Sequence, residues 1–331
     1  ECLAGTSPIR GSELCSVAEA MYSYEWLAAL TGFEKWGDRL EMTAFNALPA
    51  AISPDMWSHQ YDQLTNQPQC TRFPDKEHPF GTNGPESHLF GLEPNFGCCT
   101  ANFGQAWPKL ALSALMRTQE GIAVTAIAPV KVETIINGKK VSCELRTNYP
   151  FEDGYQVVVC AEEPVRFALD LRIPGFAQNA QADGAAAEPG KSFRIERLWE
   201  GSTEVTVTLS FQAEYVSRPS GLFCVRRGPL VYSLPVKEQW NRIEYVRDDV
   251  ERKYPYCDYE LLPLTPWNYG FVGGELTFHQ GTVGDCPFSP EGAPVWIETS
   301  LAQVDWQMKN GLCEELPRSK APISAPETLR L

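Results

Sequence analysis

The spacing of apolar residues changes near Gly121, and this change constrains the fold more than any other feature of the chain. Upstream, apolar residues such as Leu14, Val17 and Met21 recur every three to four positions, which predicts a buried helix face. Downstream they alternate, and Asn137-Gly138 predicts a tight hairpin turn between two strands. Helices followed by strands in separate blocks predict separate α and β domains rather than an alternating βαβ array.

The helical block is predicted to hold two helices within residues 11–50 and a third over 101–117. Ser12 is the expected N-cap of the first helix, and Gly32 is expected to end it. Residues 51–97 are rich in Pro, Gly, Asn and Gln, so they are predicted to be mostly loop. A loop this long in a compact protein is usually functional.

The alternating block predicts many short strands, which is typical of a β-sandwich. We therefore expect a multidomain α plus all-β protein, with a helical domain over 1–118, a β-sandwich over 119–235 and a smaller β-rich domain over 236–331. Three helices are few for a stable domain, so we expect further chain to complete it. The strands are expected at 122–127, 132–136, 140–145, 156–159, 167–173, 192–195 and 204–211.

Composition limits the classes of partner. With 43% hydrophobic and 21% charged residues among 331, the chain has the make-up of a globular protein with two or three domains. Its net charge of -14 argues against nucleic acid or an anionic membrane as partner. No run of eighteen apolar residues occurs, so no membrane span is expected.

The adjacent pair Cys98 and Cys99 is the strongest chemical signal among eleven cysteines. The pair precedes a predicted helix, whose free N–H groups and dipole favour thiolates. Upstream, Glu13 and Cys15 add a carboxylate and a third thiolate, and three Cys with one Glu form a closed donor set for zinc. Glu13 and Cys15 can face one ion only if Glu13 lies at the start of its helix, because residues two apart in a helix diverge.

Local spacing leaves three interpretations of Cys98-Cys99 open: a structural zinc site, inert buried thiols, or a catalytic thiolate. In the long loop, His59 and Tyr61 belong to a mixture of aromatic and hydrogen-bonding groups that suits sugar hydroxyls. The alternative for His59 is a loop histidine with its hydrogen bonds satisfied within the protein. Glu86 and His88 are expected to be solvated loop residues.

Three motifs together resemble the β-L-arabinofuranosidases of glycoside hydrolase family 127. They are Gly11-Ser12-Glu13-Leu14-Cys15, Ser58-His59-Gln60-Tyr61-Asp62-Gln63 and Gly97-Cys98-Cys99-Thr100-Ala101-Asn102. Leu171-Arg172-Ile173-Pro174-Gly175 and Arg227-Gly228-Pro229 resemble strand-region signatures of the same family. The resemblance implies that the helices are the last of an (α/α)6 barrel, followed by β-sandwich domains.

The resemblance also implies a mechanism. One zinc would be bound by Glu13, Cys15, Cys98 and Cys99, and Cys98 would attack the anomeric carbon in hydrolysis with retention. The acid/base glutamate of the family precedes the Glu-x-Cys motif, which maps it to Glu1, although the interval is shorter than in bacterial arabinofuranosidases. His59 and Tyr61 would hold the sugar.

The expected function is therefore a retaining hydrolase of β-L-arabinofuranosides or similar furanosides. The expected partners are a carbohydrate substrate and an N-terminal segment or separate chain that completes the barrel. The alternative is a non-catalytic carbohydrate-binding or assembly protein with a structural zinc site. Polysaccharide chemistry favours a secreted or lumenal location.

Overall fold

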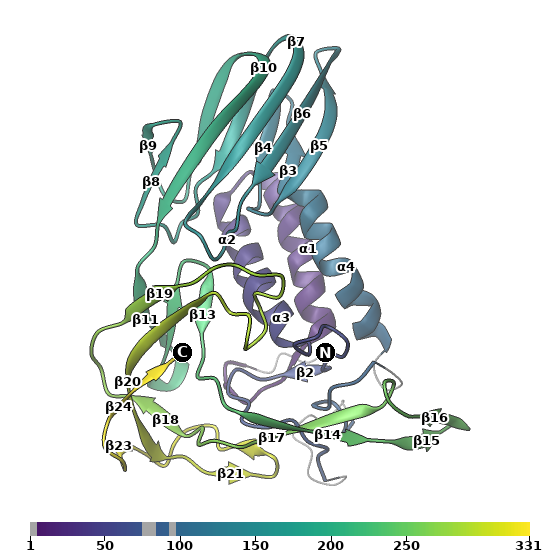
Figure 1. Ribbon diagram of the computed structural model, residues 1–331, viewed down its shortest axis with the longest axis vertical. Helices are drawn as coiled ribbons and strands as arrows, with labels where there is room; N and C mark the ends of the chain where they lie inside the picture. The colour runs from purple at the N-terminus through teal and green to yellow at the C-terminus, as the bar shows by residue number, and fades with distance from the viewer. Residues whose placement is uncertain (1–4, 75–83, 93–96) are drawn as a thin grey trace.

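A small helical block lies under a long twisted sheet, and further strands surround its other end (Figure 1). The computed structural model describes residues 5–74, 84–92 and 97–331. Strands dominate this part of the chain, which confirms the expected sheet-rich protein with few helices. The assignment of the helices to the end of an (α/α)6 barrel stays a prediction.

The two helices expected within residues 11–50 are present. Helix α1 covers Leu14–Thr31, and Gly32 ends it in a left-handed conformation (φ 65°), as expected. Helix α2 covers Glu34–Met42 and continues through a π-helical turn, η1 (Thr43–Ala47), into the short α3 (Leu48–Ala50).

The third helix, α4, covers Gly97–Ala114 rather than 101–117. It therefore includes both cysteines of the pair in its first turn. Its apolar pattern does not stop at Ala114, but residues Leu115–Arg117 leave the helix as β3 and pair with β4 (Gly121–Val124). This pairing ties the end of α4 to the edge of the sheet.

The main sheet has the order β3-β4-β7-β10-β8-β9, and the hairpin β5–β6 joins it through β6 and β7. The four short strands expected at 156–159, 167–173, 192–195 and 204–211 prove to be two long ones, β7 and β10, paired antiparallel. Residues 162–164 are exposed at mid-length, and the register of the pair shifts there at a β-bulge between Trp199 and Gly201, so the apolar alternation stops while both strands run on. The strand bounds are β5 Val130–Ile136, β6 Lys139–Arg146, β7 Gly154–Arg172, β8 Asn179–Ala182, β9 Ala185–Ala187 and β10 Ser192–Ser210.

A second group of strands packs together beside the helices. The sheet β11-β12-β13 shares a small apolar cluster with the C-terminal sheet, formed by Val225, Ile297, Leu301 and Leu331. The domain limits expected at 118 and 235 stay a prediction. The bounds are β11 Ala213–Arg218, β12 Leu222–Arg227, β13 Leu230–Tyr232, β18 Tyr269–Phe271, β19 Thr277–Gln280, β20 Val295–Asp305, β21 Met308–Lys309, β22 Leu312–Cys313, β23 Ser319–Pro322 and β24 Glu327–Arg330.

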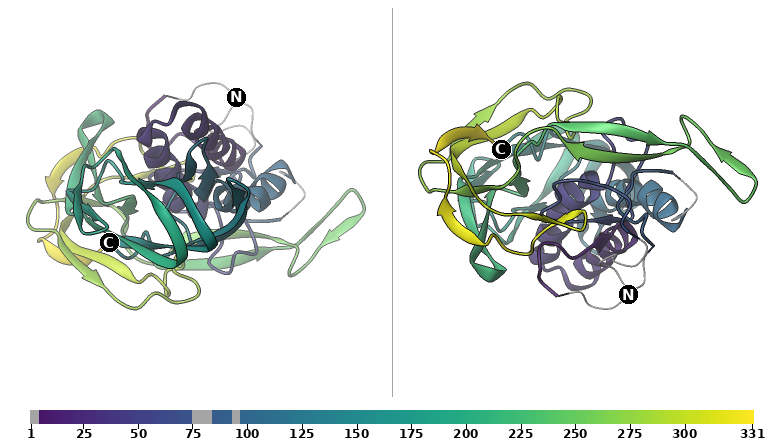
Figure 2. Two further views of the ribbon diagram at one scale, coloured as in Figure 1. Left: turned by 90° about the horizontal axis from the view of Figure 1, so that it is seen from above. Right: turned by 90° about the horizontal axis from the view of Figure 1, so that it is seen from below.

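A two-stranded ribbon, β14 (Glu238–Ile243) and β17 (Asp258–Pro263), holds the long loop that follows α3. The loop forms isolated bridges to β17 at Cys70 and Phe90. The tip of the ribbon, β15 (Tyr245–Arg247) with β16 (Val250–Arg252), extends beyond the rest of the molecule (Figure 2). These bridges give the loop a defined path although it has little regular structure of its own.

Buried charges join the helices to the main sheet. Arg172, at the end of β7, is fully buried and donates to Glu41 (2.8 Å), Glu34 (2.9 Å) and Asp38 (2.7 Å), all on α2. Gly37 leaves room for the guanidinium, because a Cβ there would lie 2.5 Å from its Nη1. A large apolar cluster runs from α1 and α4 into the sheet around this junction. Within the described ranges, no helix is both long and apolar enough to cross a membrane.

Candidate functional site

Four predicted ligand residues converge at one end of the helical block. The ligand atoms of Glu13, Cys15, Cys98 and Cys99 all lie within 4.8 Å of one another. Helices α1 and α4 run side by side in the same direction (Figure 1), so their first turns are neighbours. The fold therefore brings together two motifs that are more than eighty residues apart in the chain.

Glu13 lies at the start of its helix, which is the condition for Glu13 and Cys15 to face one ion. Residues Ser12–Glu13 form a short strand, β1, which pairs with β2 (Asp62–Gln63). Glu13 has extended backbone (φ -66°, ψ 133°) and is itself the N-cap of α1, so the prediction that Ser12 caps the helix is wrong. Because Glu13 pairs as a strand residue, the helix begins one residue later than the apolar spacing predicted. As a result the carboxylate approaches from outside the helix and Cys15 from its first turn.

The two motifs meet through their sulfur atoms. Cys15 Sγ and Cys99 Sγ lie 3.4 Å apart, Cys99 is buried, and Cys98 is exposed at the start of α4. Burial raises the pKa of Cys15 to about 11 and also raises the pKa of Cys99. For Cys99, burial outweighs the helix-start effect that was expected to favour a thiolate. A bound cation would reverse this balance, because it stabilises the deprotonated sulfurs directly.

His59 lies against the start of α4. Its Nε2 is 2.8 Å from Thr100 Oγ1, and that hydroxyl donates its proton to the Leu92 carbonyl oxygen at 2.8 Å. His59 Nδ1 lies 3.3 Å from the Gln60 carbonyl oxygen, so both ring nitrogens have a partner within the protein. The His59 backbone also pairs with Gly91 in both directions. His59 therefore supports the residue that follows the cysteine pair, and its contact with a sugar stays a prediction.

The other predicted site residues lie as follows. Tyr61 is buried in the main apolar cluster, and its carbonyl oxygen accepts a hydrogen bond from the first residue of α1. Its role with a sugar also stays a prediction. Glu1 lies outside the described residues.

The sequence analysis was wrong about one residue near the site and did not single out another. His88 was expected to be solvated but is fully buried against the ring of Phe73, and this burial lowers its pKa to about 3. Asn102 was not singled out, yet its side chain opposes the rise in the pKa of Cys15. Its position three residues after Cys99 in a helix was the available signal, since such residues share a face.

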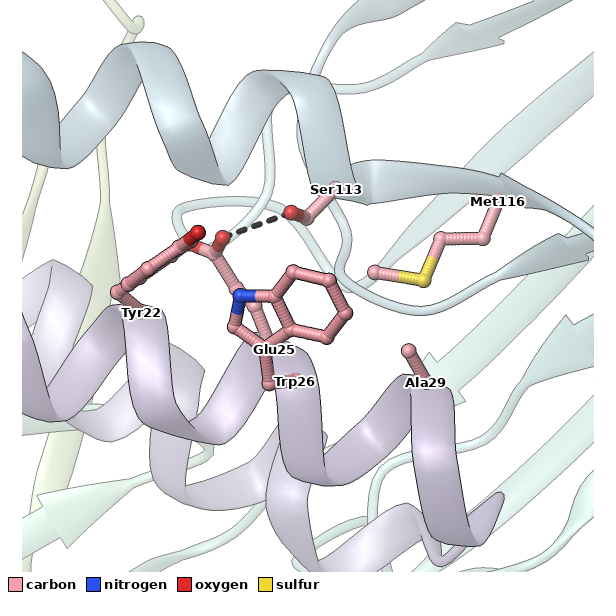
Figure 3. A pocket seen from close by; sticks show the side chains of 6 residues that line it. All are labelled: Tyr22, Glu25, Trp26, Ala29, Ser113 and Met116. Carbon is pink, nitrogen blue, oxygen red and sulfur yellow. Dashed lines mark hydrogen bonds between the residues drawn. The ribbon is translucent and has the colours of Figure 1, made fainter.

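A pocket of about 260 Å³ opens elsewhere between α1 and α4 (Figure 3). Its one carboxyl group belongs to Glu25, which accepts a hydrogen bond from Ser113 at 2.7 Å. Burial raises the pKa of Glu25. Glu25 follows Cys15 by ten helical residues, a rise of about 15 Å, so this pocket is separate from the cysteine cluster. The lining residues are Tyr22, Glu25, Trp26, Ala29, Ser113 and Met116.

Comparison with family models and with solved structures finds similarity to glycoside hydrolases. Residues 121–211 match the family model described as β-L-arabinofuranosidase, GH127 middle domain. A search of curated proteins found no match. Among solved structures, a GH127 β-L-arabinofuranosidase from Geobacillus stearothermophilus T6 is similar over 98% of this chain, with 19% identity and a TM-score of 0.67.

Two further structures agree. One is titled a glycoside hydrolase (17% identity, TM-score 0.63, 98% of this chain) and the other a GH127 β-arabinofuranosidase (17% identity, TM-score 0.60, 98% of this chain). The chain spans about half of each structure, namely 47%, 50% and 46% of their lengths. Residues 121–211 thus match the GH127 middle domain, and the fold of the chain is similar to that of GH127 structures, in agreement with the resemblance of the sequence motifs.

Proposed function

We propose that Glu13, Cys15, Cys98 and Cys99 form the zinc-thiolate centre of a retaining glycoside hydrolase that releases β-L-arabinofuranose or a similar furanoside. The observation that carries the proposal is the convergence of these four ligand atoms within 4.8 Å. The similar GH127 structures support the choice of reaction class.

The residues fit a zinc ion by their chemistry and their spacing. Zn–S bonds of about 2.3 Å in a tetrahedral shell place neighbouring sulfurs roughly 3.8 Å apart. The Cys15 and Cys99 sulfurs lie 3.4 Å apart, so a small adjustment suffices. Three thiolates and one carboxylate also match the soft, four-coordinate preference of zinc. When bound, the ion would keep the cysteine sulfurs deprotonated at neutral pH.

Cys98 is the proposed nucleophile because it is the exposed member of the cluster. Its sulfur attacks the anomeric carbon, and the bond from that carbon to the leaving oxygen breaks. The proposed acid/base, Glu1, gives its proton to the leaving oxygen and then removes a proton from the water that releases the sugar from sulfur. The two displacements together retain the anomeric configuration.

His59 and Tyr61 are the proposed sugar-binding residues. The hydrogen bond between His59 and Thr100 places the imidazole beside the first turn of α4. A sugar positioned for attack by Cys98 would lie next to the same turn. His59 would then both orient the helix start and contact the substrate.

The helical block leaves an apolar surface for a partner. Trp26, Leu30 and Phe33 are 53%, 76% and 60% exposed around the second half of α1, and Leu112 on α4 is 81% exposed. We propose that this surface packs against further helices of an (α/α)6 barrel, supplied by an N-terminal segment or a separate chain. The proposal is supported by the greater length of the similar structures.

The test is hydrolysis of a chromogenic β-L-arabinofuranoside by the protein together with its barrel-completing segment, with and without a zinc chelator. Zinc content is measured in the same samples. We expect one zinc per chain, chelator-sensitive release, and complete loss of release in Cys98→Ser. Cys160→Ser is the matched control, because this cysteine lies on the main sheet far from the cluster, and it should keep full activity.

Each other outcome has a definite meaning. Activity in Cys98→Ser would exclude Cys98 as the nucleophile. Zinc without hydrolysis, together with melting of the helical block when zinc is removed, would favour the alternative of a carbohydrate-binding or assembly protein with a structural zinc. A protein that binds no zinc would refute the proposed centre.

A further inference from the structure

The pocket between α1 and α4 contains a carboxyl group with one unused oxygen. Glu25 is only 3% exposed, and its Oε2 accepts the hydrogen bond from Ser113. Its Oε1 is buried and has no hydrogen-bond partner among the residues that the structure describes. A buried carboxylate oxygen without a donor is costly, so this atom points to a further group that binds in the pocket.

The neighbouring cation Lys109, on α4, does not supply that donor. Its Nζ lies 3.8 Å from the centroid of the Tyr22 ring, whose face attracts the ammonium group. The charge of Lys109 acts on Glu25 through space, but no hydrogen bond joins it to Oε1 within the described part of the chain. The acceptor therefore stays open to a donor from elsewhere.

The walls of the pocket suit a flat cation. Figure 3 shows the rings of Tyr22 and Trp26 on the α1 side, and the side chain of Met116 reaching in from β3. A guanidinium group is planar and more weakly hydrated than an ammonium group, and it stacks on aromatic rings while it donates to a carboxylate. An apolar, aromatic wall around a single carboxylate oxygen is therefore better matched to a guanidinium group than to an ammonium group.

The size of the pocket favours the end of a side chain over a whole small molecule. Pockets that hold small-molecule ligands usually measure about 300–1,000 Å³. This pocket measures about 260 Å³, and it is lined by only six residues.

The surface around the pocket indicates where such a side chain comes from. Trp26 lines the pocket and is also 53% exposed, and Leu30 and Leu112, which each follow a lining residue, are 76% and 81% exposed. A free ligand would leave these apolar side chains in water. A protein segment that covers this face would bury them and deliver a side chain to the pocket in the same event.

We propose that the pocket binds the guanidinium group of an arginine from the protein segment that covers this face, and that Glu25 Oε1 accepts an N–H from it. The inference rests on that part of the proposed function in which further helices cover this surface, and it is independent of the zinc centre. Glu25 is then an anchor for assembly of the helical block.

The first test measures binding of N-acetylarginine methylamide to the full chain by ligand-observed nuclear magnetic resonance. N-acetylcitrulline methylamide is the control ligand, because it has nearly the same shape without the charge. Charge-assisted hydrogen bonds are about twice as strong as neutral ones. We therefore expect the arginine probe to bind about tenfold more tightly than the citrulline probe.

Three variants assign the binding to the pocket. Glu25→Gln removes the charge with little change of shape, so it should weaken binding of the arginine probe about tenfold and remove its advantage over citrulline. Ala29→Leu narrows the pocket from an exposed helix position and should also weaken binding. Glu19→Gln, at an exposed position of the same helix, is the matched control and should bind as the wild type does. Circular dichroism identifies a variant that fails to fold, and if Glu25→Gln fails, Ala29→Leu carries the test.

The second test uses the protein together with its barrel-completing segment. There the arginine already fills the pocket, so the probe should no longer bind. Glu25→Gln should weaken association with that segment about tenfold, although it removes a buried charge and should raise the melting temperature of the chain alone. A merely structural role for Glu25 would not move stability and association in opposite directions.

The outcomes separate this inference from the proposed function. Probe binding that persists in the assembled protein would overturn the arginine of the covering segment in favour of a free guanidinium compound. Equal binding of the two probes, or unchanged binding in both Glu25→Gln and Ala29→Leu, would overturn the inference while zinc-dependent hydrolysis could still be found. Loss of the probe site on assembly, in a protein without zinc or hydrolysis, would support the inference and refute the zinc centre alone.

Discussion

Replacement of Arg172 by methionine should destabilise the junction between the helices and the main sheet. The side chain is fully buried and makes ion pairs with Glu34, Asp38 and Glu41 on α2. Arg172→Met removes the only positive charge of this cluster while Glu41 remains fully buried. Breaking one side of a buried ion pair costs about 3–5 kcal/mol, because the remaining charge is left without compensation.

The remaining contacts of Glu41 put the expected loss in the free energy of unfolding at the lower end of that range. Glu41 also accepts hydrogen bonds from the Tyr149 hydroxyl (2.7 Å) and the Ile127 N–H (3.1 Å), which stay in place in the variant. We therefore expect a loss of about 3 kcal/mol in the free energy of unfolding. With a urea m-value of about 1–3 kcal/mol/M, the midpoint should fall by roughly 1–3 M.

The assay is urea unfolding followed by far-ultraviolet circular dichroism. Arg146→Met is the matched control, since Arg146 forms a similar two-bonded pair with Glu144 on the protein surface. Its urea midpoint should not change measurably, because surface pairs contribute little. The double variant Arg172→Met with Glu41→Gln should be less destabilised than the sum of the single variants, because both charges are gone. An unchanged midpoint in Arg172→Met would refute the reasoning.

Three further predictions concern the rest of the fold, and thermal unfolding checks each of them. Burial raises the pKa of Glu25 above its unfolded value of 4.5, so the stability that the protonated Glu25 contributes is fully present below that pH and is lost as pH rises through the folded pKa. Glu25→Gln should therefore raise the melting temperature at pH 7 and weaken the dependence of the melting temperature on pH between 4 and 7. A lower melting temperature at pH 7 would contradict this. Gly121→Ala should destabilise by about 3 kcal/mol or more, because the new methyl group would overlap the Ala168 carbonyl oxygen; wild-type stability would contradict the close approach of β4 and β7. The Asn46 side chain, in the π-helical turn after α2, donates to the Pro229 carbonyl oxygen and accepts from the Val231 N–H in β13. Asn46→Ala should therefore lower the free energy of unfolding by about 1–3 kcal/mol, whereas an unchanged melting temperature would show that these hydrogen bonds contribute nothing.

Much of the helical block could be predicted because its apolar spacing is strong and Gly32 is a clear end signal. The start of α1 could not, because the pairing of Glu13 with Asp62 depends on a loop about fifty residues away. The long strands β7 and β10 were divided in the prediction, since exposed residues at a mid-length β-bulge interrupt the alternation although the two strands pair on both sides of it. Burial of His88 likewise depends on tertiary contacts of a loop that has no periodic pattern.

The candidate site was more predictable than the loops around it. Cysteine and glutamate at these spacings limit the chemistry to few possibilities, and the structure brings all four residues together. Asn102 escaped prediction because an asparagine in a helix has no distinctive chemistry until its neighbours are known. Hydrogen-bond direction is a property of the assembled network and has no signature in the order of residues.

The 3.4 Å separation of the Cys15 and Cys99 sulfurs has a consequence for where the protein matures. Two thiols this close can also exchange with an external disulfide, which takes up two electrons and two protons as the cysteines become linked. That linkage would withdraw two of the four donors from the cluster. If the chain works in a secreted or lumenal setting, the metal ion must therefore bind before the cysteines meet an oxidant. The timing of ion delivery then decides what fraction of the protein keeps all four donors for the metal.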